Sequence, residues 1–154
     1  HDAANHAVSF LKKVIKLTDI PPENVAEEDI DLFHTTAIVK VPQETSFCFL
    51  EKEQQIDDAR TTLNFVSHLD EYNFREIPEG TIVGHLTANP DHDLLNVQNV
   101  HDEQVFRRYF SIDGNELRTS KQLMPSMLST SEKAVQLDCL CYLMERIKTD
   151  GTLY

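Results

Sequence analysis

The sequence contains no tryptophan and only 4 glycines among its 154 residues. Without tryptophan, a hydrophobic core has to be built from Leu, Ile, Val and Phe. A phosphate-binding loop places several glycines at fixed spacings before a helix, and the few glycines here fall in turn-like stretches instead. The shortage of glycine therefore argues against a nucleotide-binding protein of that kind.

Cysteine is also scarce, with Cys48, Cys139 and Cys141 as the only three. Three cysteines are too few for a scaffold built on disulfides, and the odd number leaves at least one thiol free or bonded to another molecule. No nucleophile signature surrounds them, and each lies in an apolar alternation. We expect buried cysteines that pack rather than react.

Basic residues are outnumbered, since 14 Lys and Arg face 26 Asp and Glu, for a formal net charge of -12. This balance argues against binding to a nucleic-acid backbone, which needs clustered cations. It argues equally against an electrostatic anchor on an anionic membrane. A cationic partner is permitted, including a divalent metal held by oxygen ligands.

Long hydrophobic runs are absent: no stretch approaches the roughly 18 apolar residues of a membrane span. Residues 1–7 are polar and do not have the form of a signal peptide. Hydrophobic residues nevertheless make up 40% of the chain, too many for a disordered protein. The length suits one ordinary domain or two small ones.

The pattern of apolar residues predicts one helix followed by short strands. Ala7, Leu11, Val14 and Ile15 share one helical face within residues 3–19, although residues 14–17 alone could also close a strand. Short β-type runs separated by turn signals then favour a β-sandwich. These runs cover residues 35–41, 46–50, 61–66, 81–88, 106–112 and 116–119.

Residues 131–149 fit two interpretations. Ser129 and Glu132 have the spacing of a capping box, and Leu137, Leu140 and Met144 then lie on one helical face. The same segment also alternates as a strand would, through the residues Val135, Leu137, Cys139, Cys141 and Leu143. Both a helix and a strand remain open here.

Three motifs resemble the cadherin repeat. Residues 77–84 read Ile-Pro-Glu-Gly-Thr-Ile-Val-Gly, like the opening of such a repeat. Residues 86–91 resemble the next strand with its Asp-x-Asp loop, and residues 110–119 resemble the mid-repeat hairpin. The resemblance implies an all-β protein made of cadherin-like Greek-key β-sandwich repeats.

The resemblance also implies a division into two repeats. Residues 42–47 and 70–73 resemble the end of one repeat and an eroded linker. Residues 1–70 would then form a divergent or incomplete repeat, and residues 71–154 a second repeat whose last strand is missing. The second repeat lacks the family's Asp-Arg-Glu and has Leu-Met-Pro-Ser at 123–126 instead.

In cadherins, calcium binds where two repeats meet. Mapped onto this sequence, the ligands implied by the resemblance are Glu44, Asp70, Asn73, Asn89 and Asp91. Two of these are Asn where the family has Asp, and Asn supplies only a neutral oxygen. We therefore expect calcium binding that is weak or absent.

The function implied by the resemblance is non-enzymatic and extracellular. It is adhesion or recognition by a cell-surface protein through a protein partner on another cell or the same surface, homophilic or heterophilic. Exposed sheet faces or the terminal strand would make the contact, without nucleic acid and without direct membrane insertion. The alternative is an intracellular α+β protein-interaction module with a winged-helix-like C-terminus, made of helices over residues 119–126 and 131–148.

Overall fold

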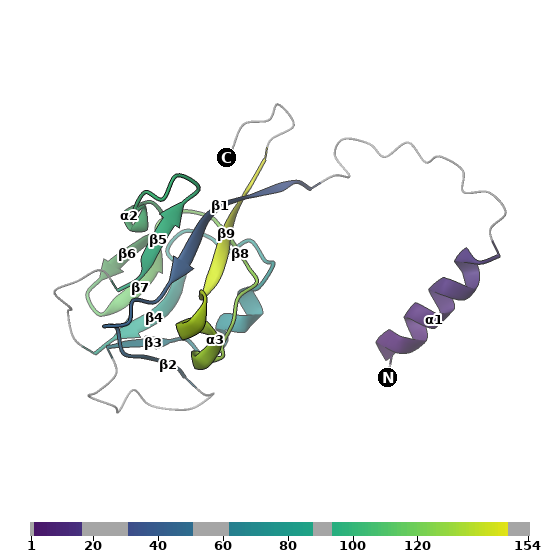
Figure 1. The fold of residues 1–154 in the computed structure, drawn as a ribbon, viewed down its shortest axis with the longest axis horizontal. Coiled ribbons are helices and arrows are strands. Elements are labelled where there is room, and N and C mark those ends of the chain that lie inside the picture. Colours follow the sequence, from purple (N-terminus) through teal and green to yellow (C-terminus); the bar gives the residue numbers. More distant parts are fainter. Residues whose placement is uncertain (1, 17–30, 51–61, 88–93, 148–154) are drawn as a thin grey trace. The chain divides into compact units, whose positions relative to one another are not determined.

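A computed structural model describes residues 2–16, 31–50, 62–87 and 94–147 (Figure 1). The chain divides into two compact units, His1–Ile30 and Asp31–Tyr154.

The first unit contains the helix α1, Asp2–Val14. It confirms the predicted helix, and Lys12 and Lys13 in its last turn complement the helix dipole. The apolar side chains of Phe10 and Leu11 are more than half exposed. No helix in the described part of the chain is long and apolar enough to cross a membrane.

The second unit is rich in β-strand and contains two sheets. The first sheet has the strand order β5-β1-β9-β8, and the second has the order β2-β3-β4-β7-β6. All neighbouring strands run antiparallel except β2 and β3, which are parallel. The strands are β1 Phe33–Lys40, β2 Phe47–Phe49, β3 Leu63–Phe65, β4 Ile82–Leu86, β5 Asn96–Asn99, β6 Phe110–Asp113, β7 Glu116–Thr119, β8 Met124–Ser126 and β9 Cys141–Arg146.

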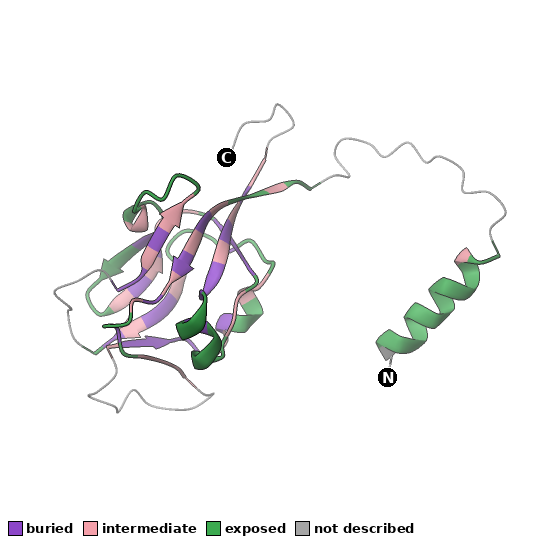
Figure 2. Ribbon diagram, viewed as in Figure 1, coloured by how far each residue is buried: buried purple, intermediate pink, exposed green. Residues whose placement is uncertain are grey.

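Short helical segments lie between the strands: the 3-10 helix η2 Leu69–Tyr72, and the α-helices α2 Phe106–Tyr109 and α3 Glu132–Leu137. One hydrophobic core joins the two sheets. Val39 and Leu143 of the first sheet belong to the same buried cluster as Leu63, Phe65 and Leu117 of the second (Figure 2). The prediction of a β-rich fold is confirmed.

The predicted boundary at residue 70 falls inside this unit. Strand β1 pairs with β5 and β9, and β3 pairs with β4. Each sheet therefore combines strands from before and after residue 70. The backbone of β1 makes its hydrogen bonds with β5 and β9 in the first sheet, and that of β3 with β4 in the second. Residue 70 is not a boundary between compact units in this structure.

The described part of the segment 131–149, residues 131–147, holds a helix and then a strand. Helix α3 is short, its N-cap is Ser131 rather than Ser129, and Ser131 makes no capping bond with its side chain. Strand β9 follows and pairs with β1 and β8. The prediction of a single long helix over residues 131–148 is therefore wrong, because the second half of this segment pairs with β1 and β8 as a strand.

The winged-helix-like alternative is overturned with it. Its first helix was expected over residues 119–126, where the structure has the end of β7 and strand β8. Neither of its two helices forms as predicted in this part of the chain.

Candidate functional site

The described residues that were predicted to hold calcium lie in different parts of the fold. Glu44 is exposed in the turn before β2, and Asp70 is exposed in η2. The side-chain oxygen of Asn73 accepts a hydrogen bond from the amide of Leu128 at 3.1 Å. Asn89 and Asp91 lie outside the described residues.

Calcium takes six to eight oxygen ligands. Within the described ranges, no three His, Cys, Asp or Glu side chains form a group that could hold a metal ion. Asn89 and Asp91, two of the five implied ligands, lie outside these ranges. The calcium site therefore stays a prediction.

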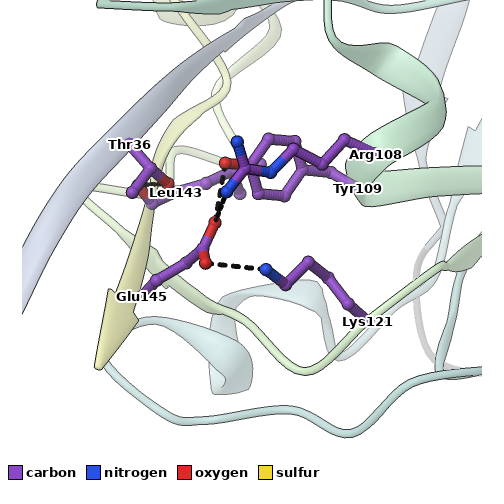
Figure 3. A network of polar contacts seen from close by, with 6 residues as sticks. All are labelled: Thr36, Arg108, Tyr109, Lys121, Leu143 and Glu145. Carbon is purple, nitrogen blue, oxygen red and sulfur yellow. Dashed lines mark hydrogen bonds and ion pairs between the residues drawn. The ribbon is translucent and has the colours of Figure 1, made fainter. Parts of the chain in front are cut away.

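A buried carboxylate, which the sequence analysis did not single out, lies at the end of β9. Glu145 has a side chain only 2% exposed and accepts three hydrogen bonds (Figure 3). The donors are the Tyr109 hydroxyl at 2.8 Å, Lys121 Nζ at 2.6 Å and Arg108 Nη2 at 3.2 Å. Two cations and a phenol thus compensate one buried negative charge, as burial of a charge requires.

The alternation of β9 brings Glu145 to this position. Cys141, Leu143 and Glu145 are the buried residues of the strand, because successive side chains of a strand point to opposite faces. Thr36 of β1 donates to the carbonyl oxygen of Leu143 at 3.2 Å beside the network (Figure 3). Glu145 therefore occupies the inward register of an otherwise apolar row.

The network shifts the pKa values of its members. Burial alone would raise the pKa of the Glu145 carboxyl, but the hydrogen bonds from Lys121 and Tyr109 and the charges of Lys121 and Arg108 outweigh it, so the pKa lies below its ordinary value. Burial, with the hydrogen bond to Glu145 and its negative charge, raises the pKa of Tyr109. Glu145 is thereby held as a carboxylate and Tyr109 as a neutral phenol.

A groove of about 430 Å³ lies beside this network. Within it, Arg146 donates to Glu76 through Nε at 3.2 Å and through Nη2 at 2.6 Å, and it also pairs with Asp31. These three charges compensate one another at the protein surface, which favours a structural role. The groove is lined by Glu76, Lys121, Gln122, Leu123, Met144, Glu145 and Arg146.

Two of the cysteines are buried thiols. Burial raises the pKa of Cys141, and burial with the nearby Asp138 charge raises that of Cys139. A raised pKa disfavours the thiolate, which is the nucleophilic form. Cys48 donates to the side-chain oxygen of Asn64 at 3.1 Å. Cys139 and Cys141 are therefore buried as expected, whereas Cys48 is only half-buried.

The other candidate site is a surface made of residues 70–75 and 125–132, which we call the loop surface. The amide of Phe74 donates to the carbonyl oxygen of Pro125 at 2.7 Å, and Leu128 is bonded to Asn73. These two bonds tie the two segments together. They lie far apart in the sequence, and no sequence motif indicated that they meet.

Two large apolar residues are exposed on the loop surface. Phe74 is 58% exposed and Met127 is 68% exposed. Both have left-handed backbone, with φ of 58° and 53°, a conformation that costs a residue other than glycine about 1–2 kcal/mol. Strained backbone of this kind gathers at functional sites.

A second groove, of about 580 Å³, opens beside these segments. We call it the acidic groove, because Asp70 and Glu132 are both among its lining residues. The predicted ligand Asp70 and Glu132 therefore line the same groove, and Glu44 is not part of its described lining. The described lining residues are Phe49, Leu50, Val66, Ser67, Asp70, Thr130 and Glu132.

Comparison of the chain with protein-family models, with curated proteins and with solved structures found no match. The cadherin resemblance and the function that it implies therefore stay predictions.

Proposed function

We propose that residues 31–154 form a non-enzymatic recognition module that binds another protein through the loop surface. The observation that carries the proposal is the pair of Phe74 and Met127, both exposed and both on left-handed backbone. A side chain that is exposed and apolar on a strained backbone buries little apolar area to stabilise the free protein. A partner that buries both side chains would gain binding free energy from their apolar area.

The resemblance to cadherin repeats supports a more specific form of this proposal. The module is a cadherin-like Greek-key β-sandwich in the ectodomain of a cell-surface adhesion protein. The two-sheet, β-rich fold is consistent with this assignment, and the motifs in residues 77–119 are the basis for it.

Cell staining tests the proposal. The full chain is biotinylated at one terminus, assembled on fluorescent streptavidin into tetramers and applied to cells that each display one membrane protein from an expression library. We expect staining of cells that display a particular protein, and its loss in the double variant Phe74→Asn with Met127→Asn. A matched control replaces Val100 and Ile112, which are 67% and 44% exposed elsewhere, by Asn and should stain as the unmodified chain does. Absence of staining, or equal staining by both double variants, would contradict the proposal.

A further inference from the structure

The acidic groove lies against the loop surface. Asp70 belongs to η2, and Glu132 is the first residue of α3, so both acids fall within residues 70–75 and 125–132. The strand side of the groove is apolar, with Phe49 and Leu50 half-buried and Val66 buried. The groove is therefore continuous with the surface proposed above to bind a protein.

The described lining residues of the groove carry charge of one sign only. Asp70 and Glu132 are exposed, and no cation is found among the described lining residues. Neither acid takes part in an ion pair with another described residue. This contrasts with Glu145 and Glu76, whose charges are compensated by Lys121 and Arg146 within the protein.

We propose that the acidic groove binds a partner segment in which a lysine or arginine stands next to an apolar side chain. The inference rests on the proposed function and adds the chemistry of the partner. The alkyl stem of the cation lies along the apolar wall of Phe49 and Leu50, and its charged head reaches the carboxylates of Asp70 and Glu132. The net charge of -12 attracts such a segment from a distance, whereas an acidic segment is repelled.

A random seven-residue peptide library displayed on phage is the probe, and the intact chain is the bait. The expected result is a set of selected peptides with Lys or Arg beside an aromatic or aliphatic residue. Their synthetic forms should bind about tenfold more weakly to the double variant Asp70→Asn with Glu132→Gln at low salt, and salt should weaken binding to the unmodified chain.

The control variant carries the same change of charge elsewhere. Glu79 and Asp113 are exposed outside the loop surface, and their replacement by Gln and Asn should leave peptide binding nearly unchanged. Far-UV circular dichroism confirms that both double variants fold.

Four outcomes overturn the inference. Peptides without a cation, or equal binding by the two double variants, remove the acidic groove as the cation site. If, in either case, the peptides still bind more weakly to the double variant Phe74→Asn with Met127→Asn than to the unmodified chain, the proposed function stands and only the inference fails. If no peptide is selected, or if none depends on Phe74 and Met127, the proposed function fails as well.

Discussion

The backbone amide of Phe74 donates a hydrogen bond to the carbonyl oxygen of Pro125 at 2.7 Å. This bond joins the segment after η2 to the end of β8 and holds Phe74 close to the chain that leads to Met127. Rigid placement of exposed apolar side chains lowers the entropy that a partner has to overcome on binding. The pairing of these two segments is what makes the loop surface a defined feature of the fold.

The first prediction is that Phe74→Asn and Met127→Asn each stabilise the free protein. Asparagine tolerates the left-handed conformation, and little buried apolar area is lost, so each change should raise the free energy of unfolding by about 0.5–1 kcal/mol. Urea unfolding measures it. Val100→Asn, at an exposed residue without positive φ, should give no such gain, and destabilisation by both loop variants would show that their backbone is not strained.

The second prediction concerns the Tyr109 hydroxyl. Tyr109→Phe removes a donor at 2.8 Å from a buried carboxylate and should lower the free energy of unfolding by about 1.5–3 kcal/mol, the range for hydrogen bonds to charged groups. A double-mutant cycle with Glu145→Gln isolates the coupling between the two side chains. Additive effects of the two changes would mean that the bond contributes nothing to stability.

The third prediction is a dependence of stability on pH that comes from Glu145. Its pKa in the folded protein is lowered from an unfolded value of about 4.3. The carboxylate therefore contributes stability above that pH, and the contribution is lost as the pH falls through the folded-state pKa. Urea unfolding at a series of pH values from neutral downward should show a smaller acid loss in Glu145→Gln than in the unmodified protein. Parallel pH profiles would contradict this role.

The fourth prediction compares two glycines. A Cβ on Gly84 would lie 2.9 Å from Leu63 Cδ1 and 3.2 Å from the Asn64 carbonyl oxygen, so Gly84→Ala should destabilise by about 1–3 kcal/mol through overpacking. Gly114 has φ of 59°, and a Cβ added to it would meet nothing within 4 Å, so Gly114→Ala should cost only the backbone strain of about 1–2 kcal/mol. Thermal unfolding with a heat-capacity analysis measures both. An unchanged unfolding temperature in Gly84→Ala would contradict the prediction that Leu63 and Asn64 leave no room for a Cβ.

Much of the sheet structure could be predicted because its signal is local. The β-branched run of β1 and the hairpin of β6 and β7 both lie where the sequence indicated. The strands β5 and β8 were missed, since β5 reads Asn-Val-Gln-Asn and β8 contains Pro125. Both are edge strands of the first sheet, where a proline without an amide hydrogen is tolerated.

The candidate sites were less predictable because they depend on contacts between distant segments. Strand alternation after Cys141 and Leu143 could have indicated that Glu145 points inward, but its partners Tyr109 and Lys121 come from other elements. The left-handed backbone of Phe74 and Met127 has no sequence signal, because neither residue type favours it. The predicted strand at residues 106–112 failed in its first half, where α2 forms before β6.

Hydrogen–deuterium exchange of the intact chain, free and bound to a membrane protein found by cell staining, tests the recognition surface most directly. The account predicts that the amides of residues 73–75 and 126–128 exchange more slowly in the complex, while those of the β6–β7 hairpin do not change. Protection confined to the outer face of either sheet, with the amides of residues 73–75 and 126–128 unaffected, would contradict it.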